Sequence, residues 1–214
     1  MTPFFPSASL AIGYVVACLL LAATPGADMA LFLSRTLGGG RGQGFAAQAG
    51  ANVGLVVHTV AAALGLSALL AASSEAYQAV KIAGAVYLLW LAYGAIRRGT
   101  ALKLQHGGAA GGSRGAFWAG LLINLTNPKI VLFFVTFLPQ FIDAHDPHAS
   151  AKLFVLGFGF IAVTTFVNAA VILVAARFVA AARANPLSLR LFDYAFAALM
   201  SLFAARLVWS ETRR

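Results

Sequence analysis

Long apolar runs constrain this chain more than any other feature of its sequence. Residues 1–27 contain no charged side chain, the apolar run resumes directly after Asp28, and residues 153–176 are also uncharged. A helix needs about 20 predominantly apolar residues to cross about 30 Å of hydrocarbon. Only 10% of the 214 residues are charged, whereas soluble domains carry about 25%. The sequence therefore predicts an all-α integral membrane protein.

Six transmembrane helices are predicted from these runs. The first run has no basic leader and is longer than a signal-peptide core, so we expect it to remain in the membrane. Arg190, Asp193 and Arg206 crowd the ends of the last run, and we expect these side chains to reach the membrane interface. The predicted spans cover residues 9–34, 46–70, 76–96, 115–142, 153–176 and 189–209.

The basic residues predict the orientation of the spans. Four Lys and Arg residues flank the membrane on one side: Lys81, Lys152, Arg213 and Arg214. Nine follow spans one, three and five: Arg35, Arg41, Arg97, Arg98, Lys103, Arg114, Arg177, Arg183 and Arg190. Because cytoplasmic loops are enriched in Lys and Arg, these three loops are predicted to be cytoplasmic and both termini periplasmic. The net charge of +9 thus indicates an anionic membrane surface as its partner, and no nucleic acid.

The organisation of the chain suggests an internal repeat. Residues 99–114 are rich in glycine and basic residues, as in a flexible cytoplasmic linker. This linker separates two pseudo-repeats, residues 1–98 and 115–214, within a single membrane domain. Because each half contains three spans, the halves are predicted to be inverted relative to each other in the membrane.

Each half carries a polar residue followed by proline inside its first span: Thr24-Pro25 and Asn127-Pro128. Proline removes a backbone donor and disfavours helix in the residue before it. Thr or Asn as an N-cap with proline at the first helical position is also how a new helix begins. At about 1.5 Å per residue, the two prolines lie about 15 and 20 Å from the cytoplasmic edge. Two helix breaks near mid-membrane are predicted.

Asp28 and Lys129 are the ionisable residues beside these breaks. Each costs about 2.5–3.5 kcal/mol at the centre of a membrane helix, so both need a compensating partner. One interpretation is a structural ion pair that only holds the halves together. The other is a polar cavity in which Asp28 binds an ammonium or a proton and Lys129 attracts a carboxylate. Interrupted helices at corresponding positions of two halves are typical of a transporter's binding site.

Two further residues are candidates for the same site. His58 lies mid-span and is interpreted either as a proton relay or as an internally hydrogen-bonded histidine. Asn124 precedes Asn127 by three residues and is expected to share its helix face. Asn52, six residues before His58, is expected to face elsewhere. Gly50 and Gly54 form a G-x-x-x-G pattern that we interpret as close packing within the protein.

Other chemistry is poorly supported by the sequence. The segment DAHDPHAS, residues 143–150, contains two carboxylates and two imidazoles, but their spacing matches no defined metal site. We interpret it as a solvated turn. With Cys18 as the single cysteine, no cysteine metal site is available. No catalytic or phosphate-binding motif is present, so neither an enzyme nor a cofactor is expected.

These motifs resemble the LysE/RhtB family of bacterial amino-acid exporters, over nearly the whole chain. The first element is Thr24-Pro25-Gly26 with Asp28 three residues after the proline. The most specific is NLTNPKIVLFFVTFLPQF, from Asn124. The stretches SRTLGGGRGQG, VHTVAAALGLSALLAAS and KIAGAVYLLWLAYGAIR are also similar to the family. One departure is Ala27, which stands where the family usually has a second proline and puts the geometry of the first break in question.

The resemblance implies export of small amino acids or their derivatives across the bacterial inner membrane, coupled to proton influx. The substrate and the proton are then the partners besides the lipid bilayer, and the oligomeric state, including a homo-oligomer, is left open. The alternatives are a metal or cation exporter and a non-transporting membrane module with a structural charge pair. The expected site residues are Thr24, Pro25, Gly26, Asp28, His58, Asn124, Asn127, Pro128 and Lys129.

Overall fold

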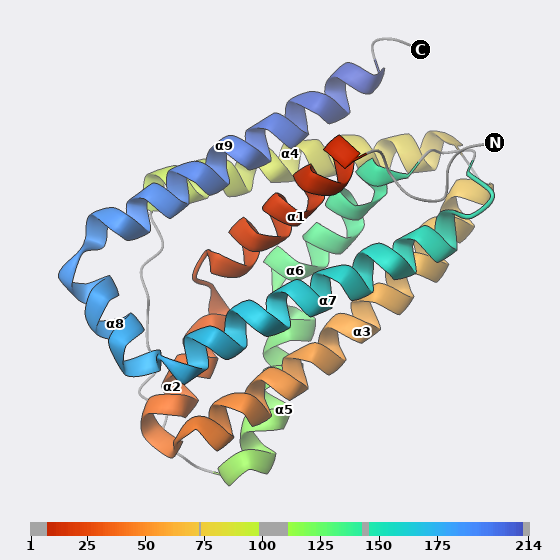
Figure 1. The fold of residues 1–214 in the computed structure, drawn as a ribbon. Coiled ribbons are helices and arrows are strands. Elements are labelled where there is room, and N and C mark those ends of the chain that lie inside the picture. Colours follow the sequence, from red (N-terminus) through yellow and green to blue (C-terminus); the bar gives the residue numbers. More distant parts are fainter. Residues whose placement is uncertain (1–7, 73, 99–110, 143–145, 212–214) are drawn as a thin grey trace.

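The computed structural model describes residues 8–72, 74–98, 111–142 and 146–211, and these are helical with short connections (Figure 1). This confirms the predicted all-α class. Within the described residues, the helices over Arg41–Leu66 and Ala149–Leu173 are long and apolar enough to cross a membrane. Counting each of two bent helix pairs as one span raises the number to four. The remaining long helices contain shorter apolar stretches, Ile82–Arg97 and Asp193–Leu202.

The first half of the chain forms four helices. The first predicted span is divided into α1 (Ala8–Ala23) and α2 (Ala27–Gly39), which are bent by 50° relative to each other. The second and third spans correspond to α3 (Arg41–Ala72) and α4 (Ser74–Arg98). Gly40, with φ of 82°, ends α2. Its left-handed backbone lets the chain reverse directly into α3.

The second half repeats the bend. α5 (Gly112–Thr126) and the segment that begins with α6 (Pro128–Leu132) are also bent by 50°. After α6 the chain continues through a π-helical turn, η1 (Phe133–Phe137), and a 3-10 turn, η2 (Leu138–Phe141). The expected linker is thus shorter than predicted at its end, because residues 112–114 already belong to α5. Its residues 99–110 lie outside the described residues.

The chain ends with α7 (Ala149–Leu173), α8 (Ala175–Ala184) and α9 (Pro186–Glu211). The α8 region was predicted to be part of a loop, and this prediction is wrong because the region is helical. The residues expected to form a solvated turn before α7 also differ, because Asp146 is buried and pairs with Lys152. Burial alone would raise the pKa of the Asp146 carboxyl, but the bonds from Lys152 and the His148 backbone lower it below its usual value.

The helices form a bundle in which α3 packs against α2, α5 and α7, and α4 packs against α9 (Figure 1). The start of α1, the end of α3, the start of α4, the start of α7 and the end of α9 lie toward the upper right of Figure 1. The α2–α3 turn, the start of α5 and α8 lie toward the lower left. Both helix breaks lie between these two ends of the bundle. From its break, α2 runs toward the lower left of Figure 1, whereas α6 runs toward the upper right.

Small residues bring the central helices together. A Cβ atom added at Gly50 on α3 would lie 1.9 Å from the carbonyl oxygen of Phe117, and one at Gly120 on α5 would lie 1.9 Å from that of Ala47. A Cβ at Gly54 would lie 2.6 Å from Oδ1 of Asn124. The G-x-x-x-G pattern therefore serves packing inside the protein, as predicted. Lipid supplies no hydrophobic drive between helices, so such close backbone contact stabilises the bundle.

We expect Gly50→Ala to lower the stability of the bundle by about 1–3 kcal/mol, the range for overpacking a filled interior. Thermal unfolding of the purified protein in detergent measures this effect. Gly65→Ala is the matched control on the same helix, because a Cβ there meets no atom within 4 Å, and it should leave stability unchanged or slightly higher. Equal effects of the two changes would contradict the close α3–α5 crossing.

Candidate functional site

The first break differs in detail from its prediction. α1 ends at Ala23, and Gly26, not Thr24, is the N-cap of α2, with extended backbone and no side-chain capping bond. The hydroxyl of Thr24 instead donates to the carbonyl of Leu20 at 2.6 Å. Thr24 thus completes the end of α1, and Pro25 lies in the connection rather than at the first helical position. The break forms although Ala27 replaces the second proline of the family pattern.

The second break agrees with its prediction. Asn127 is the N-cap of α6, and its side-chain oxygen accepts a hydrogen bond from the backbone N–H of Lys129 at 3.1 Å. Pro128 occupies the first helical position, where its missing N–H removes no intrahelical bond. A new helix therefore begins at Pro128, directly after α5.

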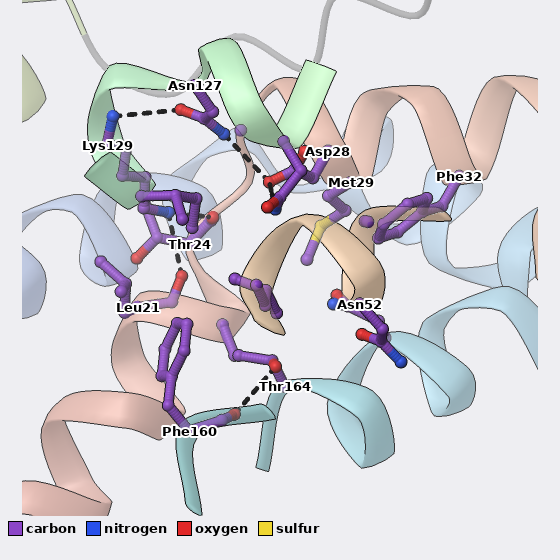
Figure 2. A pocket seen from close by; sticks show the side chains of 17 residues that line it. Leu21, Thr24, Asp28, Met29, Phe32, Asn52, Asn127, Lys129, Phe160 and Thr164 are labelled. Atoms are coloured by element: carbon purple, nitrogen blue, oxygen red, sulfur yellow. Dashed lines mark hydrogen bonds between the residues drawn. The ribbon is translucent and has the colours of Figure 1, made fainter. Parts of the chain in front are cut away.

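The two breaks meet at the carboxylate of Asp28, in the first turn of α2 (Figure 2). Its Oδ2 atom accepts hydrogen bonds from Nδ2 of Asn127 at 3.0 Å and from Nδ2 of Asn124 at 3.3 Å. Asn124 and Asn127 are both buried and lie on one face, as their spacing predicted. The second half of the chain thus supplies both donors to the single acid of the first break.

Lys129, on the second break, in turn binds the backbone of the first break (Figure 2). Its ammonium donates to the carbonyl oxygens of Leu21 at 2.9 Å and Thr24 at 3.0 Å, at the C-terminal end of α1. The last carbonyls of a helix lack intrahelical donors and carry the negative end of its dipole, so a cation there is stabilised. Among the described ion pairs none joins Lys129 to Asp28. The expected structural charge pair is therefore not formed directly in this conformation.

Asp193 corrects one expectation from the sequence. It was expected to reach the membrane interface, but its side chain is only 1% exposed within the protein. Phe196, one turn further along α9, has its ring centre 5.6 Å from the Lys129 ammonium. This contact places α9 beside Lys129. Burial of Asp193 depends on how α9 packs, which its position near the end of an apolar run did not reveal.

A cavity of about 50 Å³ lies at the junction of the two breaks. It is large enough for a few water molecules. α1, α2, α3, α5, α6 and α7 all contribute to its walls. Of the predicted site residues, Thr24, Gly26, Asp28, Asn124, Asn127 and Lys129 line it, and Pro25, His58 and Pro128 do not. Three polar lining residues were not among the predicted site residues: Asn52, Thr164 and Asn168.

Two acceptors beside this cavity lack donors. The Oδ1 atom of Asp28 and the Oδ1 atom of Asn124 are buried, and neither has a hydrogen-bond partner among the described residues. A buried acceptor without a partner costs about 1–3 kcal/mol, and more when it is charged. The unpaired oxygen of Asp28 therefore favours a ligand that brings a donor.

His58 lies one contact away from the cavity. Its Nε2 atom is 3.3 Å from the backbone carbonyl oxygen of Asn124, and its ring stacks on Phe134 with centroids 5.7 Å apart. It thus contacts the residue that holds Asp28 rather than the cavity itself.

No group of three His, Cys, Asp or Glu side chains with the arrangement of a metal site is found among the described residues. Residues 143–145 of the segment DAHDPHAS lie outside them.

A small charged cavity at two helix breaks within an apolar bundle is typical of a membrane transporter. Residues 19–211 match the LysE type translocator family. The chain belongs to this family, as the resemblance in its motifs indicated.

Curated relatives support the assignment. The homoserine/homoserine lactone efflux proteins of Salmonella typhi and Salmonella typhimurium are each 33% identical over 195 residues, covering 91% of this chain and 93% of the relative. A leucine efflux protein of an Enterobacter species is 31% identical over 147 residues, covering 67% of this chain and 68% of the relative. No solved structure matches the chain significantly. Since these relatives are efflux proteins, the expectation that the chain is not an enzyme is confirmed.

We expect Lys129→Met to destabilise the bundle by about 2 kcal/mol, because a hydrogen bond to a charged group contributes about 1.5–3 kcal/mol and two carbonyls lose their donor. Thermal unfolding in detergent is the measurement. Arg97→Met is the control: Arg97 is exposed, and its guanidinium contacts only the Tyr93 side chain among the described residues. Its loss should therefore change stability by less than about 0.5 kcal/mol. Unchanged stability of Lys129→Met would contradict its role at the end of α1.

Proposed function

We propose that this protein is a secondary active exporter of small amino acids or their derivatives across the bacterial inner membrane, driven by proton influx. The proposed site is the cavity at the two breaks, with Asp28 and Lys129 as its charged groups. The observation that carries the proposal is the buried Oδ1 atom of Asp28, which has no donor within the described residues. The names of the relatives, which record efflux of homoserine, its lactone and leucine, support the same class of substrate.

The charges of the cavity suit the two charged groups of an amino acid. A substrate ammonium carries three donors, and one of them would satisfy Oδ1 of Asp28 while Oδ2 stays bound to the two asparagines. The Lys129 ammonium has three donors and uses two on the α1 carbonyls, so one remains for the substrate carboxylate. The N-terminus of α2 adds favourable potential for an anion, since its N-cap supplies no side-chain bond.

In this proposal, proton coupling arises because a proton and the substrate ammonium compete for the Oδ1 atom of Asp28. Either a proton or a substrate ammonium supplies the missing donor at Asp28, and binding both together would leave the ammonium without its counter-charge. A site that exchanges one for the other exports substrate in return for a proton. His58, in contact with the carbonyl of Asn124, is proposed to transfer protons toward this site.

We propose that the bundle has six transmembrane spans arranged as two inverted three-helix repeats. In this arrangement α4 and α9 are spans, and each bent pair is one. Three observations support it: equal bends of 50° in corresponding helices, the opposite directions of α2 and α6 (Figure 1), and the hydrogen bond from Asn127 to Asp28 that joins the two breaks. Gly26, the N-cap of α2, has Asn127, the N-cap of α6, as its counterpart.

We expect Asp28→Asn to lower pH-driven export by about 10- to 100-fold, because a hydrogen bond to a charged group contributes about 1.5–3 kcal/mol. Purified variants in liposomes, with an imposed pH gradient and labelled amino acids, provide the measurement. Asp28→Glu keeps the charge and serves as the conservative comparison.

The double change Asp28→Asn with Lys129→Gln separates the proposed role from a purely structural one. If Asp28 and Lys129 only balance each other, removing both should restore transport, because neither of these two buried charges is then left without the other. If Asp28 binds the substrate or a proton, the double variant should be as inactive as Asp28→Asn. Restored export in the double variant would overturn the functional assignment of Asp28.

The proposed topology places both termini and the α6–α7 connection in the periplasm and the start of α5 in the cytoplasm. Ser113 and Pro147 are exposed positions at these two ends, and the native Cys18 is buried. In intact cells, Pro147→Cys should react with a membrane-impermeant maleimide and Ser113→Cys should not. Both should react after the membrane is permeabilised. The opposite labelling pattern in intact cells would reverse the orientation.

A further inference from the structure

The wall of the cavity opposite the charged breaks is polar but uncharged. Asn52 on α3 and Thr164 and Asn168 on α7 contribute to it. Figure 2 shows Asn52 and Thr164 across the cavity from Asp28 and Asn127. Among the described residues that line the cavity, Asp28 and Lys129 are the only ionisable ones.

The hydrogen bonding of these side chains identifies which of them are available to a ligand. The Thr164 hydroxyl donates to the carbonyl of Phe160 within its own helix. The Nδ2 atom of Asn52 donates to the Thr165 hydroxyl at 3.0 Å, which leaves the Asn52 carbonyl oxygen as an acceptor. Asn168 makes no side-chain hydrogen bond with any described residue. Two amides on adjacent helices therefore carry unused donors and acceptors at one wall of the cavity.

The number of charged groups in the cavity limits which substrate side chains this wall can bind. If the proposed function holds, Asp28 and Lys129 are matched by the ammonium and carboxylate of the substrate. A third charge on the substrate side chain would face a wall without any counter-charge, where burying an ion is costly. An aliphatic side chain would instead displace water from the two amides without replacing their hydrogen bonds.

We propose that Asn52 and Asn168 form a side-chain subsite that selects amino acids with an uncharged, hydrogen-bonding side chain, such as a hydroxyl, over aliphatic ones of the same shape. This proposal rests on the proposed function and names its substrate class. The neighbouring Met29, Phe32 and Phe160 line the same cavity and contact the methylene groups of such a side chain. A site built to hydrogen-bond a substrate group rejects the analogue that lacks it more strongly than an apolar pocket does.

The test compares isosteric substrates. Counterflow of labelled amino acids into liposomes containing the full-length protein is measured for homoserine against norvaline and for threonine against valine, with aspartate and lysine as charged comparisons. The wild-type protein should transport the hydroxyl member of each pair at least tenfold more efficiently, and the charged amino acids at background level. Asn168→Leu and Asn52→Leu, which keep the side-chain shape, should each reduce that ratio toward one, mainly through a higher KM for the hydroxyl substrate.

The matched control is Asn185→Leu, an exposed asparagine between α8 and α9, which should keep the wild-type ratio. A second measurement, independent of how the variants fold, is the rise in Tm of wild-type protein in detergent, which should be larger with homoserine than with norvaline. Equal transport and equal stabilisation by the two members of each pair, or ratios unchanged in both leucine variants, would overturn the subsite while leaving export of amino acids intact. Absence of transport for every amino acid would instead overturn the proposed function itself.

Discussion

The arrangement depends on how an interrupted helix satisfies its backbone inside a membrane. Lipid offers no hydrogen bonds, so broken backbone is tolerated only where protein or an enclosed cavity completes it. Here each break is completed by the other. The Lys129 ammonium binds the last carbonyls of α1, and Asn127 both caps α6 and donates to Asp28 on α2. Neither half could keep its break in lipid alone, so the breaks and the association of the halves stabilise each other.

The same contacts between the two breaks leave an unpaired acceptor beside a cavity rather than a fully paired core. Had Lys129 paired directly with Asp28, both charges would be neutralised and the α1 carbonyls would lack a donor. With Lys129 turned to the carbonyls, one oxygen of Asp28 remains without a partner. α3 and α5 cross closely at Gly50 and Gly120, and a Cβ at Gly54 would lie 2.6 Å from the Oδ1 atom of Asn124. Packing of small residues thus leaves room for the Asn124 amide that donates to Asp28.

Features that depend on neighbouring residues could be predicted from the sequence, whereas features that depend on how the helices pack could not. The cap at Asn127 followed from an Asn-Pro pair, because a side chain and the amide two residues later settle that geometry. Thr24 failed the same rule, because its hydroxyl could equally bond the carbonyl four residues earlier. Asp193 and Asn168 could not be assigned at all. Their burial and their position at the cavity depend on which faces of α9 and α7 meet the other helices, and a uniformly apolar helix does not encode that.

The two breaks have the same bend but differ in electrostatics. Because of this difference, one side of the cavity favours an anionic group and the other a cationic group. At α6 the amide of Lys129 is already bound by the Asn127 side chain, so little potential remains there for an anion. At α2 the N-cap is Gly26, which has no side chain and lines the cavity. A Cβ atom added at Gly26 would lie 3.8 Å from the Nζ atom of Lys129. An anionic group is therefore favoured on the Gly26 and Lys129 side, and a cationic group beside the unpaired oxygen of Asp28. A zwitterion held this way directs its side chain away from both charges, toward the uncharged amides of α3 and α7.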